Sequence, residues 1–318
     1  MILLFPGQGS QKPGMAKDLV DAFPAARAVF ERADAALGTT QGTTQGTSLS
    51  TLCFEGPAAA LTLTHNAQPA LLVHGAAVWA VVKEHIAPKV TGAAGHSLGE
   101  FSAYHAVGAL SLEDAVRLVR RRGELMFETG VKVPGAMAAI LGELNRTIEE
   151  ICQEARALGI VVPANYNATE QIVVSGEVAA VEAAMDLARA AGAKRVMRLP
   201  VSGAFHSPLM APAAKGLGTA LDAARWREPS VPVWSNVTGE AVGDSATARD
   251  LLLRQLTSPV RWMEVVRNIA ARFPGTTFVE MGPGAVLSGL VKRLAPDCRT
   301  MPCGTVADVE LLLGETPA

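Results

Sequence analysis

Hydrophobic and polar positions follow two different periods along this chain, and together they predict an α/β protein. Short apolar runs at residues 1–5 and 90–94 predict buried strands, because glycine and polar residues follow each run at once. Longer stretches with helical spacing lie between and after such runs. Helices are expected over 21–36, from about 56 to 88 with Gln68-Pro69 opening the long one, over 101–107 and 111–127, and from about 305; further core strands are expected at 231–235 and 277–280.

Residues 135–202 form a pattern of their own. Apolar runs that predict strands alternate with helical patterns in the order strand, helix, strand, strand, helix, strand, over 136–141, 146–158, 161–165, 171–175, 178–191 and 195–200. This order is ferredoxin-like. Because α/β character resumes afterwards, we expect an inserted small subdomain at 129–202 within a core made of 1–128 and 203–318.

Composition narrows the functional classes. Of 318 residues, 49% are hydrophobic and 18% charged, which is typical of a globular protein. A net charge of −2 gives no reason to expect nucleic acid or an anionic membrane as partner. The apolar run 69–82 is too short to span a bilayer, and no signal peptide is recognised. The four cysteines lack metal-ligand spacing and predict free thiols in a cytoplasmic protein, and the Thr-Gln-Gly repeat at 38–46 predicts a flexible surface loop.

The first chemical motif is Gly95-His96-Ser97-Leu98-Gly99-Glu100, between a predicted strand and a predicted helix. It fits G-x-S-x-G, in which a serine nucleophile lies on a sharp strand-to-helix turn. The glycines permit the tight turn and a close approach of the helix to the strand. The helix N-terminus would place backbone N–H groups beside the Ser97 hydroxyl. The alternative is a glycine-rich loop whose serine has no chemical role.

A second candidate is an arginine on the apolar side of the helix predicted at 111–127. Arg122 falls in the middle of the apolar stripe, whereas Arg120 and Arg121 flank it; the stripe comprises Ala115, Leu118, Val119, Leu125 and Met126. A buried charge is costly unless it is paired. Arg122 therefore needs an anionic partner, which is either a protein carboxylate or a carboxylate of the substrate.

A serine nucleophile also needs a base. Of the six histidines, His206 is the best candidate, because it lies in a loop bounded by Gly203 and Pro208 where the small unit returns to the core. His96 neighbours the serine, but its side chain should point elsewhere on the turn. No acidic residue completes a triad, so something other than a carboxylate could orient His206.

Several spaced motifs together resemble one family over nearly the whole chain. They are Phe5-Pro-Gly-Gln-Gly-Ser-Gln11, Gly95-His-Ser-Leu-Gly-Glu100, Arg122-Gly123, Gly203-Ala-Phe-His-Ser207, Gln255-Leu-Thr-Ser-Pro259 and Gly282-Pro-Gly284. The chain resembles malonyl-CoA:acyl carrier protein transacylases, whose relatives include the acyltransferase domains of polyketide and fatty acid synthases. The resemblance implies an α/β-hydrolase-like core with a parallel sheet and an inserted ferredoxin-like (βαββαβ) subdomain.

The resemblance also implies a role for each matching position. These roles are nucleophile for Ser97, base and then acid for His206, binding of the malonyl carboxylate for Arg122, an oxyanion hole from the backbone N–H groups of Gln8 and Leu98, and orientation of His206 by the Gln255 carbonyl. Phe205 resembles the malonyl-selecting pattern of polyketide acyltransferases, although it could simply pack in the core. No metal or cofactor is implied.

The expected reaction is transfer of a malonyl group from malonyl-CoA to the phosphopantetheine thiol of acyl carrier protein, through a malonyl-serine ester. The resemblance implies a monomer. The alternatives are a serine esterase or thioesterase, or an acyltransferase that serves a polyketide synthase in trans or a malonate decarboxylase. Arg122 argues against the esterase alternative, because a lipid esterase has no use for a buried arginine.

Overall fold

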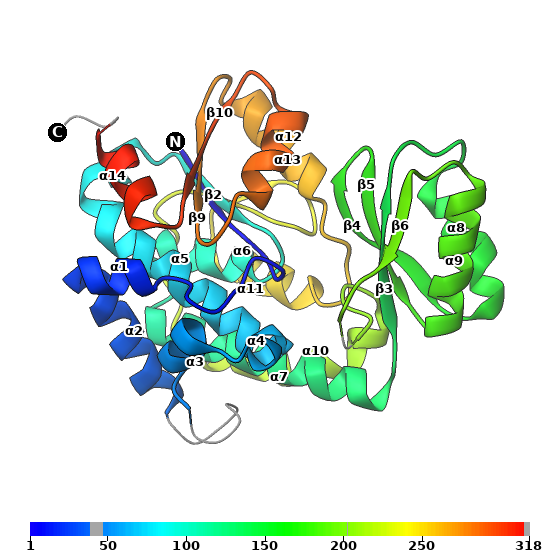
Figure 1. Ribbon diagram of the computed structural model, residues 1–318, viewed down its shortest axis with the longest axis horizontal. Coiled ribbons are helices and arrows are strands. Elements are labelled where there is room, and N and C mark those ends of the chain that lie inside the picture. Colours follow the sequence, from blue (N-terminus) through cyan, green and yellow to red (C-terminus); the bar gives the residue numbers. More distant parts are fainter. Residues whose placement is uncertain (39–46, 202, 315–318) are drawn as a thin grey trace.

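A computed structural model describes residues 1–38, 47–201 and 203–314 (Figure 1). Its larger sheet has six strands in the order β10-β9-β1-β2-β7-β8. Every pairing in it is parallel except the short hairpin of β7 and β8. The strands span Ile2–Phe5 (β1), Gly92–Gly95 (β2), Val233–Trp234 (β7), Ala241–Val242 (β8), Thr277–Met281 (β9) and Arg299–Cys303 (β10). Most of the predicted repeat, 39–46, lies outside the described residues.

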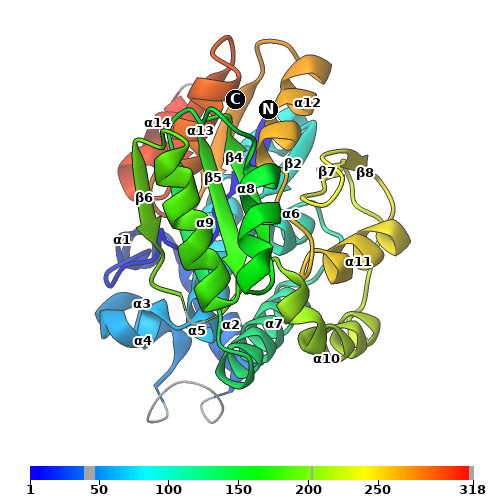
Figure 2. The same cartoon turned by 90° about the vertical axis from the view of Figure 1, so that its right-hand side faces the viewer.

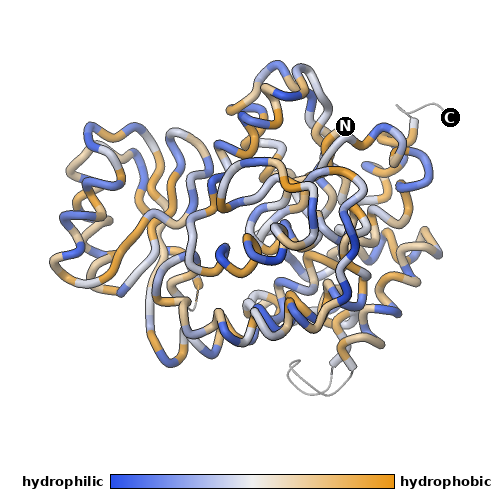
Figure 3. Tube along the Cα trace, turned by 180° about the vertical axis from the view of Figure 1, so that it is seen from behind, coloured by the Kyte–Doolittle hydropathy of each residue, from blue (hydrophilic) through white to orange (hydrophobic). Residues whose placement is uncertain are grey.

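Helices surround this sheet and supply most of the core. Hydrophilic and hydrophobic residues are interleaved along the trace of the peripheral helices (Figure 3). Buried residues recur at helical spacing in such helices, as at Ala26, Val29, Phe30 and Ala33. The helices of this unit are α1 Lys17–Ala22, α2 Pro24–Leu37, α3 Leu49–Glu55, α4 Ala58–Thr62, α5 Thr64–Ile86, α6 Gly99–Ala106, α7 Leu112–Lys132, α10 Ala211–Ala223, α11 Ser245–Arg254, α12 Trp262–Arg272, α13 Val286–Leu294 and α14 Val306–Gly314.

The second sheet has the predicted ferredoxin-like order. Its strands are β3 Ala136–Leu141, β4 Val161–Ala168, β5 Gln171–Gly176 and β6 Arg195–Arg198, arranged antiparallel as β4-β5-β3-β6. Helices α8 Ile148–Ala155 and α9 Val178–Ala190 lie side by side on one face of the sheet (Figure 2). The buried side chains between them form a separate apolar cluster. The predicted α/β class and the predicted small βαββαβ unit are confirmed.

Backbone hydrogen bonds attach the small sheet to the rest of the molecule. Tyr166 N donates to the Val260 carbonyl at 2.9 Å, and Val260 N donates to Ala164 O at 2.8 Å. This parallel bridge fixes β4 beside the segment that follows α11. Helix α7 continues through the predicted boundary at 128/129 as far as Lys132. The division into 1–128 with 203–318 and 129–202 stays a prediction.

One sequence expectation about the helices needs correction. The long helix α5 begins at Thr64, so Pro69 lies inside it, where the missing N–H removes one backbone hydrogen bond. Ser111 caps α7, because its Oγ accepts from Asp114 N at 3.0 Å and donates to the Asp114 carboxylate at 2.9 Å. The short strands β8 and β10 had no distinct sequence pattern.

Helix α5 and the turn after it, Thr64–Lys89, are long and apolar enough to cross a membrane by length and composition. It is the single such stretch in the described part of the chain, and 61% of its most apolar window is buried inside the fold. Packing against its neighbouring helices therefore accounts for its hydropathy.

A glycine at the crossing of α5 and α7 yields a stability prediction. A Cβ at Gly123 would lie 2.5 Å from His65 Cα. We expect Gly123→Ala to lower the free energy of unfolding by about 1–3 kcal/mol, because this clash outweighs the better helix propensity of alanine. The matched control is Gly289→Ala in α13, where a Cβ meets nothing within 4 Å. Urea unfolding that ranks Gly123→Ala at or above the control would contradict this packing.

Candidate active site

Three loops meet where parallel strands of the large sheet end. Gln8 follows β1, Ser97 follows β2 and Asn236 follows β7. The carboxyl ends of adjacent parallel strands share one edge of a sheet, which is where open α/β sheets bind ligands. The fold therefore brings the predicted serine turn and the N-terminal glycine-rich loop to one place.

The turn at Ser97 has the strained geometry of a nucleophile elbow. Ser97 adopts φ 54°, in the left-handed region that non-glycine residues rarely occupy. A Cβ at Gly95 would lie 1.9 Å from Gly99 C, and one at Gly99 would lie 2.1 Å from Phe5 O. Both glycines are therefore required by close backbone approach, as the sequence predicts.

Asn236 braces this turn from the neighbouring strand end. Its Oδ1 accepts from Ser97 N at 2.7 Å, and its Nδ2 donates to Gly95 O at 2.8 Å. The side chain is fully buried. Asn236 therefore helps to hold Ser97 in its unfavourable backbone conformation.

His206 faces the serine, as expected of a base. Ser97 Oγ and His206 Nε2 are 2.8 Å apart, and His206 Nδ1 lies 2.9 Å from the Gln255 carbonyl and 3.2 Å from the Ser258 carbonyl. Carbonyls only accept, so Nδ1 carries the proton and Nε2 is free to accept from the Ser97 hydroxyl. Burial, followed by the positive charge of Arg122, lowers the pKa of His206 to about 3. The imidazole is therefore neutral and can act as a base.

Arg122 is buried against the serine with neutral partners. Its Nη1 donates to Gln68 Oε1 at 2.7 Å, and its Nη2 donates to Gln255 Oε1 at 2.9 Å and to Ser97 Oγ at 3.1 Å. Burial lowers its pKa to about 10, so it stays charged at neutral pH. Among the described residues, no carboxylate forms an ion pair with it. Of the two partners considered from the sequence, a ligand carboxylate is the one this arrangement favours.

Glu100 lies beneath these groups and was not singled out from the sequence. Its Oε2 accepts from Gln255 Nε2 at 2.7 Å and from Asn236 N at 3.1 Å. Its side chain is fully buried, and burial raises its pKa to about 7 against the opposing effect of these hydrogen bonds. Glu100 thus holds the two residues that contact Arg122 and the Ser97 turn.

The remaining predicted residues also fall near the elbow. Leu98 starts the turn into α6, and neither the Leu98 N–H nor the Gln8 N–H meets an acceptor among the described residues. Gln8 is tied to α5, because its Oε1 accepts from Thr64 Oγ1 at 2.9 Å. Phe205 is buried in the main apolar core and would contact a Cβ added at Gly203.

His96 points away from the serine, as predicted. Its Nε2 lies 2.8 Å from Asn167 Oδ1 on β4, and its ring packs 5.6 Å from the Trp262 ring. The small sheet thus contacts the elbow directly.

Sequence analysis missed four buried polar residues of this network, because a buried polar side chain leaves no periodic signal in the sequence. They are Gln68, Glu100, Asn167 and Asn236. The position of Asn236 directly after a strand is the one signal that could have marked it. Arg120, expected at the flank of the stripe, is buried and bonds Asn66.

Metal chemistry has no obvious donor set in the described residues. Across 1–38, 47–201 and 203–314, no group of three or more His, Cys, Asp or Glu side chains could hold an ion. The four cysteines are free and buried.

An α/β core with a serine on a strained elbow, bonded to a neutral histidine, defines the class of enzymes with a serine nucleophile. Comparison with known proteins narrows the class. Residues 2–307 match the acyl transferase domain family, and the chain belongs to it. A malonyl CoA-acyl carrier protein transacylase of Bacillus subtilis (strain 168) is 46% identical over 312 residues, covering 98% of this chain and 95% of that protein.

Solved structures agree over the full length. An acyl-carrier-protein-S-malonyltransferase from Bartonella henselae matches with a TM-score of 0.92 and 42% identity, covering 99% of this chain and 98% of that one. A malonyl-transacylase solved in complex with its type II PKS acyl-carrier protein matches with a TM-score of 0.90 and 39% identity, covering 99% of each chain. The fold and family expected from the sequence are confirmed.

The buried carboxyl of Glu100 leads to a pH prediction. Its folded-state pKa of about 7 lies above the ordinary value of 4.5, so the folded state binds more protons between these pH values. Wild type therefore loses stability relative to Glu100→Gln as pH rises through this window. We expect the free energy of unfolding of Glu100→Gln, minus that of wild type, to increase by roughly 1–3 kcal/mol from pH 4.5 to 8.

Urea titrations at several pH values measure this difference. Glu128→Gln removes the same formal charge from the surface and serves as the control. A constant gap between Glu100→Gln and wild type across the range would show that the carboxyl does not titrate there.

Proposed function

We propose that this protein transfers a malonyl group from malonyl-CoA to the phosphopantetheine thiol of acyl carrier protein. The proposal rests on the buried Arg122 guanidinium. Its Nη2 lies 3.1 Å from Ser97 Oγ, and amide oxygens of Gln68 and Gln255 accept its other hydrogen bonds. A guanidinium pairs well with a carboxylate in bidentate geometry. The donor then has a carboxylate a short distance from the reacting carbonyl, as a malonyl thioester does.

The first half-reaction acylates the enzyme. Ser97 Oγ attacks the thioester carbonyl while His206 Nε2 takes the hydroxyl proton, and the Nδ1–H bond to the Gln255 carbonyl stabilises the imidazolium. The backbone N–H groups of Gln8 and Leu98 would stabilise the negative oxygen of the tetrahedral intermediate. The C–S bond then breaks, and His206 returns the proton to the departing coenzyme A thiolate.

The second half-reaction reverses these roles. The thiol of the carrier protein gives its proton to His206 and attacks the malonyl-serine carbonyl. The bond between the malonyl carbonyl carbon and Ser97 Oγ breaks, and the serine oxygen recovers the proton from His206. No redox step or metal is required. The relative solved with an acyl-carrier protein supports a carrier as the second substrate.

Specificity follows from the charge and size of the site. Arg122 would favour acyl groups that end in a carboxylate, because an uncharged acyl group leaves the guanidinium without a counter-charge. Phe205 would restrict bulk beside the substrate α-carbon. We further propose that the enzyme acts as a cytoplasmic monomer without a resident cofactor.

Intact mass spectrometry tests the reaction directly. Brief exposure to malonyl-CoA should add one malonyl group to wild type and none to Ser97→Ala, and holo acyl carrier protein should remove the adduct. Release of coenzyme A without a lasting adduct or a malonylated carrier would indicate hydrolysis. Absence of both adduct and coenzyme A release would reject the substrate class.

Replacing the buried arginine should change specificity more than overall competence. We expect Arg122→Ala to raise the activation free energy of acylation by malonyl-CoA by about 2–5 kcal/mol, which lowers the rate roughly 30-fold to several thousandfold. Acylation by acetyl-CoA should fall far less, because that donor offers no carboxylate. Stopped-flow acylation with both donors measures the ratio, and Arg121→Ala on the exposed side of α7 is the matched control. Equal losses with both donors would remove Arg122 from carboxylate binding.

A further inference from the structure

A second concave site lies away from Ser97, between the C-terminal part of α5 and the start of α7. It encloses about 680 Å³ and is lined by side chains from α2, α5, α6 and α7 and by the segment after α10. Its lining includes small apolar residues, among them Ala76, Ala80 and Ala106. Asp114 at its rim precedes Arg122 by eight residues on α7, about 12 Å along the helix axis. We name it the cationic hollow.

The lining of the cationic hollow is strongly positive. It contains five arginine or lysine side chains and two carboxylates, although the whole chain has a formal net charge of −2. The carboxylates are engaged, since Glu113 pairs with Arg32 at 2.8 Å and Asp114 lies 4.0 Å from Arg117. Lys83, Arg225 and Arg227 have no ion pair within the part of the chain that the structure describes. The surplus charge attracts an anion.

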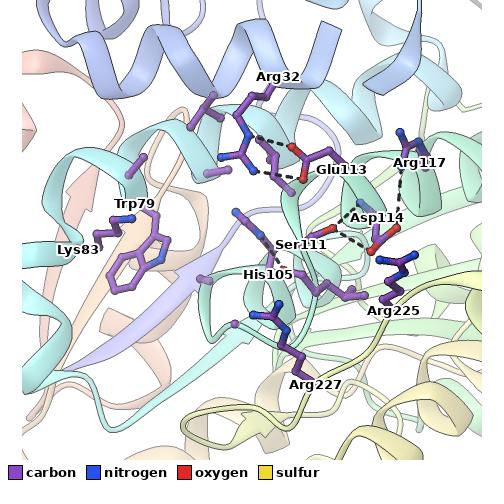
Figure 4. Close-up of a pocket in the computed structure, with 17 residues that line it drawn as sticks. Arg32, Trp79, Lys83, His105, Ser111, Glu113, Asp114, Arg117, Arg225 and Arg227 are labelled. Carbon is purple, nitrogen blue, oxygen red and sulfur yellow. Dashed lines mark hydrogen bonds and ion pairs between the residues drawn. The ribbon is translucent and has the colours of Figure 1, made fainter. Parts of the chain in front are cut away.

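The backbone fixes two of these arginines on one side. Trp226 forms a β-bridge with Leu110, and Arg227 N donates to Ala109 O at 3.0 Å. The Trp226 ring packs 5.9 Å from the Tyr104 ring. Alternate side chains of an extended segment point to opposite sides, so Arg225 and Arg227 share the face turned away from Trp226. Figure 4 shows both at one side of the hollow.

The nearby acids do not neutralise this pair. Glu228 binds Ser245 N and Oγ at 3.0 and 2.7 Å, and Asp222 pairs with Arg249. The Arg225 and Arg227 guanidinium groups each offer paired donors of the kind that phosphate oxygens accept.

The opposite wall presents an aromatic ring beside a third cation. Trp79 and Lys83 are four residues apart on α5, so they project from the same face of the helix. The Trp79 side chain is half-buried, and Figure 4 shows it with Lys83 across the hollow from Arg225 and Arg227. The part of the indole ring that faces the hollow could stack on a planar ring.

We propose that the cationic hollow binds a nucleoside diphosphate moiety, with the base on Trp79 and the phosphates between Arg225, Arg227 and Lys83. The volume lies within the range of small-ligand sites. The site is separate from the serine, so the proposal goes beyond the malonyl transfer. A free nucleotide and the nucleotide end of coenzyme A share this chemistry.

Isothermal titration of the intact protein with ADP, inorganic pyrophosphate and adenosine tests the proposal. We expect ADP to bind most tightly, pyrophosphate more weakly and adenosine least. Arg225→Ala/Arg227→Ala should weaken ADP binding about tenfold or more, and added salt should weaken it in wild type. Trp79→Leu should weaken ADP while sparing pyrophosphate. Coenzyme A displaces ADP if its nucleotide end is the natural ligand and leaves ADP bound if a free nucleotide is.

The matched control is Arg189→Ala/Arg198→Ala, which removes two exposed arginines from the small subdomain. It should bind ADP as wild type does. Urea unfolding of Arg225→Ala/Arg227→Ala verifies its fold. Its acylation by malonyl-CoA should be unchanged if a free nucleotide is the natural ligand and slower if the nucleotide end of coenzyme A is, and failure of the malonyl reaction would leave the ADP titration untouched. Equal ADP affinity in wild type and Arg225→Ala/Arg227→Ala, or no ADP binding at millimolar concentration, would overturn the proposal.

Discussion

The burial of one positive charge beside the serine constrains the structure around it. The Arg122 guanidinium is almost fully removed from water, yet the oxygens that accept its hydrogen bonds in the described part of the chain belong to two amides and a hydroxyl. Such a charge is expensive to bury unless hydrogen bonds compensate for lost hydration. Gln255 supplies much of that compensation, because its Oε1 accepts from Arg122 while its carbonyl accepts from His206. One residue thereby sets the positions of the Arg122 guanidinium and the His206 imidazole.

The same network supports backbone strain at Ser97. Ser97 and His206 both adopt positive φ, at 54° and 58°, and such conformations persist only where the surroundings enforce them. Asn236 fixes the Ser97 turn, and Glu100 fixes Asn236 and Gln255 together. The Asn236 side chain therefore holds the Ser97 turn, while the carbonyls of Gln255 and Ser258 hold the His206 ring.

Charge is distributed unevenly over the rest of the molecule. Acidic and basic side chains on the exposed helices pair locally, at spacings of three or four residues, and such pairs contribute little stability. The cationic hollow departs from this pattern. A backbone bridge fixes the segment that carries Arg225 and Arg227, and the neighbouring acids Asp222 and Glu228 are engaged elsewhere.

Features that depend on near neighbours could be predicted from the sequence. Gly95 is one, because a Cβ there would clash with the backbone of Gly99 four residues on, and helical periodicity placed Arg122 on a buried face. Gly99 belongs to the same motif, but the contact that requires it is with Phe5 O, on another strand, and arises from the tertiary fold. Gln68, Asn236 and Gln255 come from three distant segments and reach the site through contacts across the sheet edge and between helices. A buried polar residue is identified by its partners in space, and periodicity along the chain carries no record of those partners.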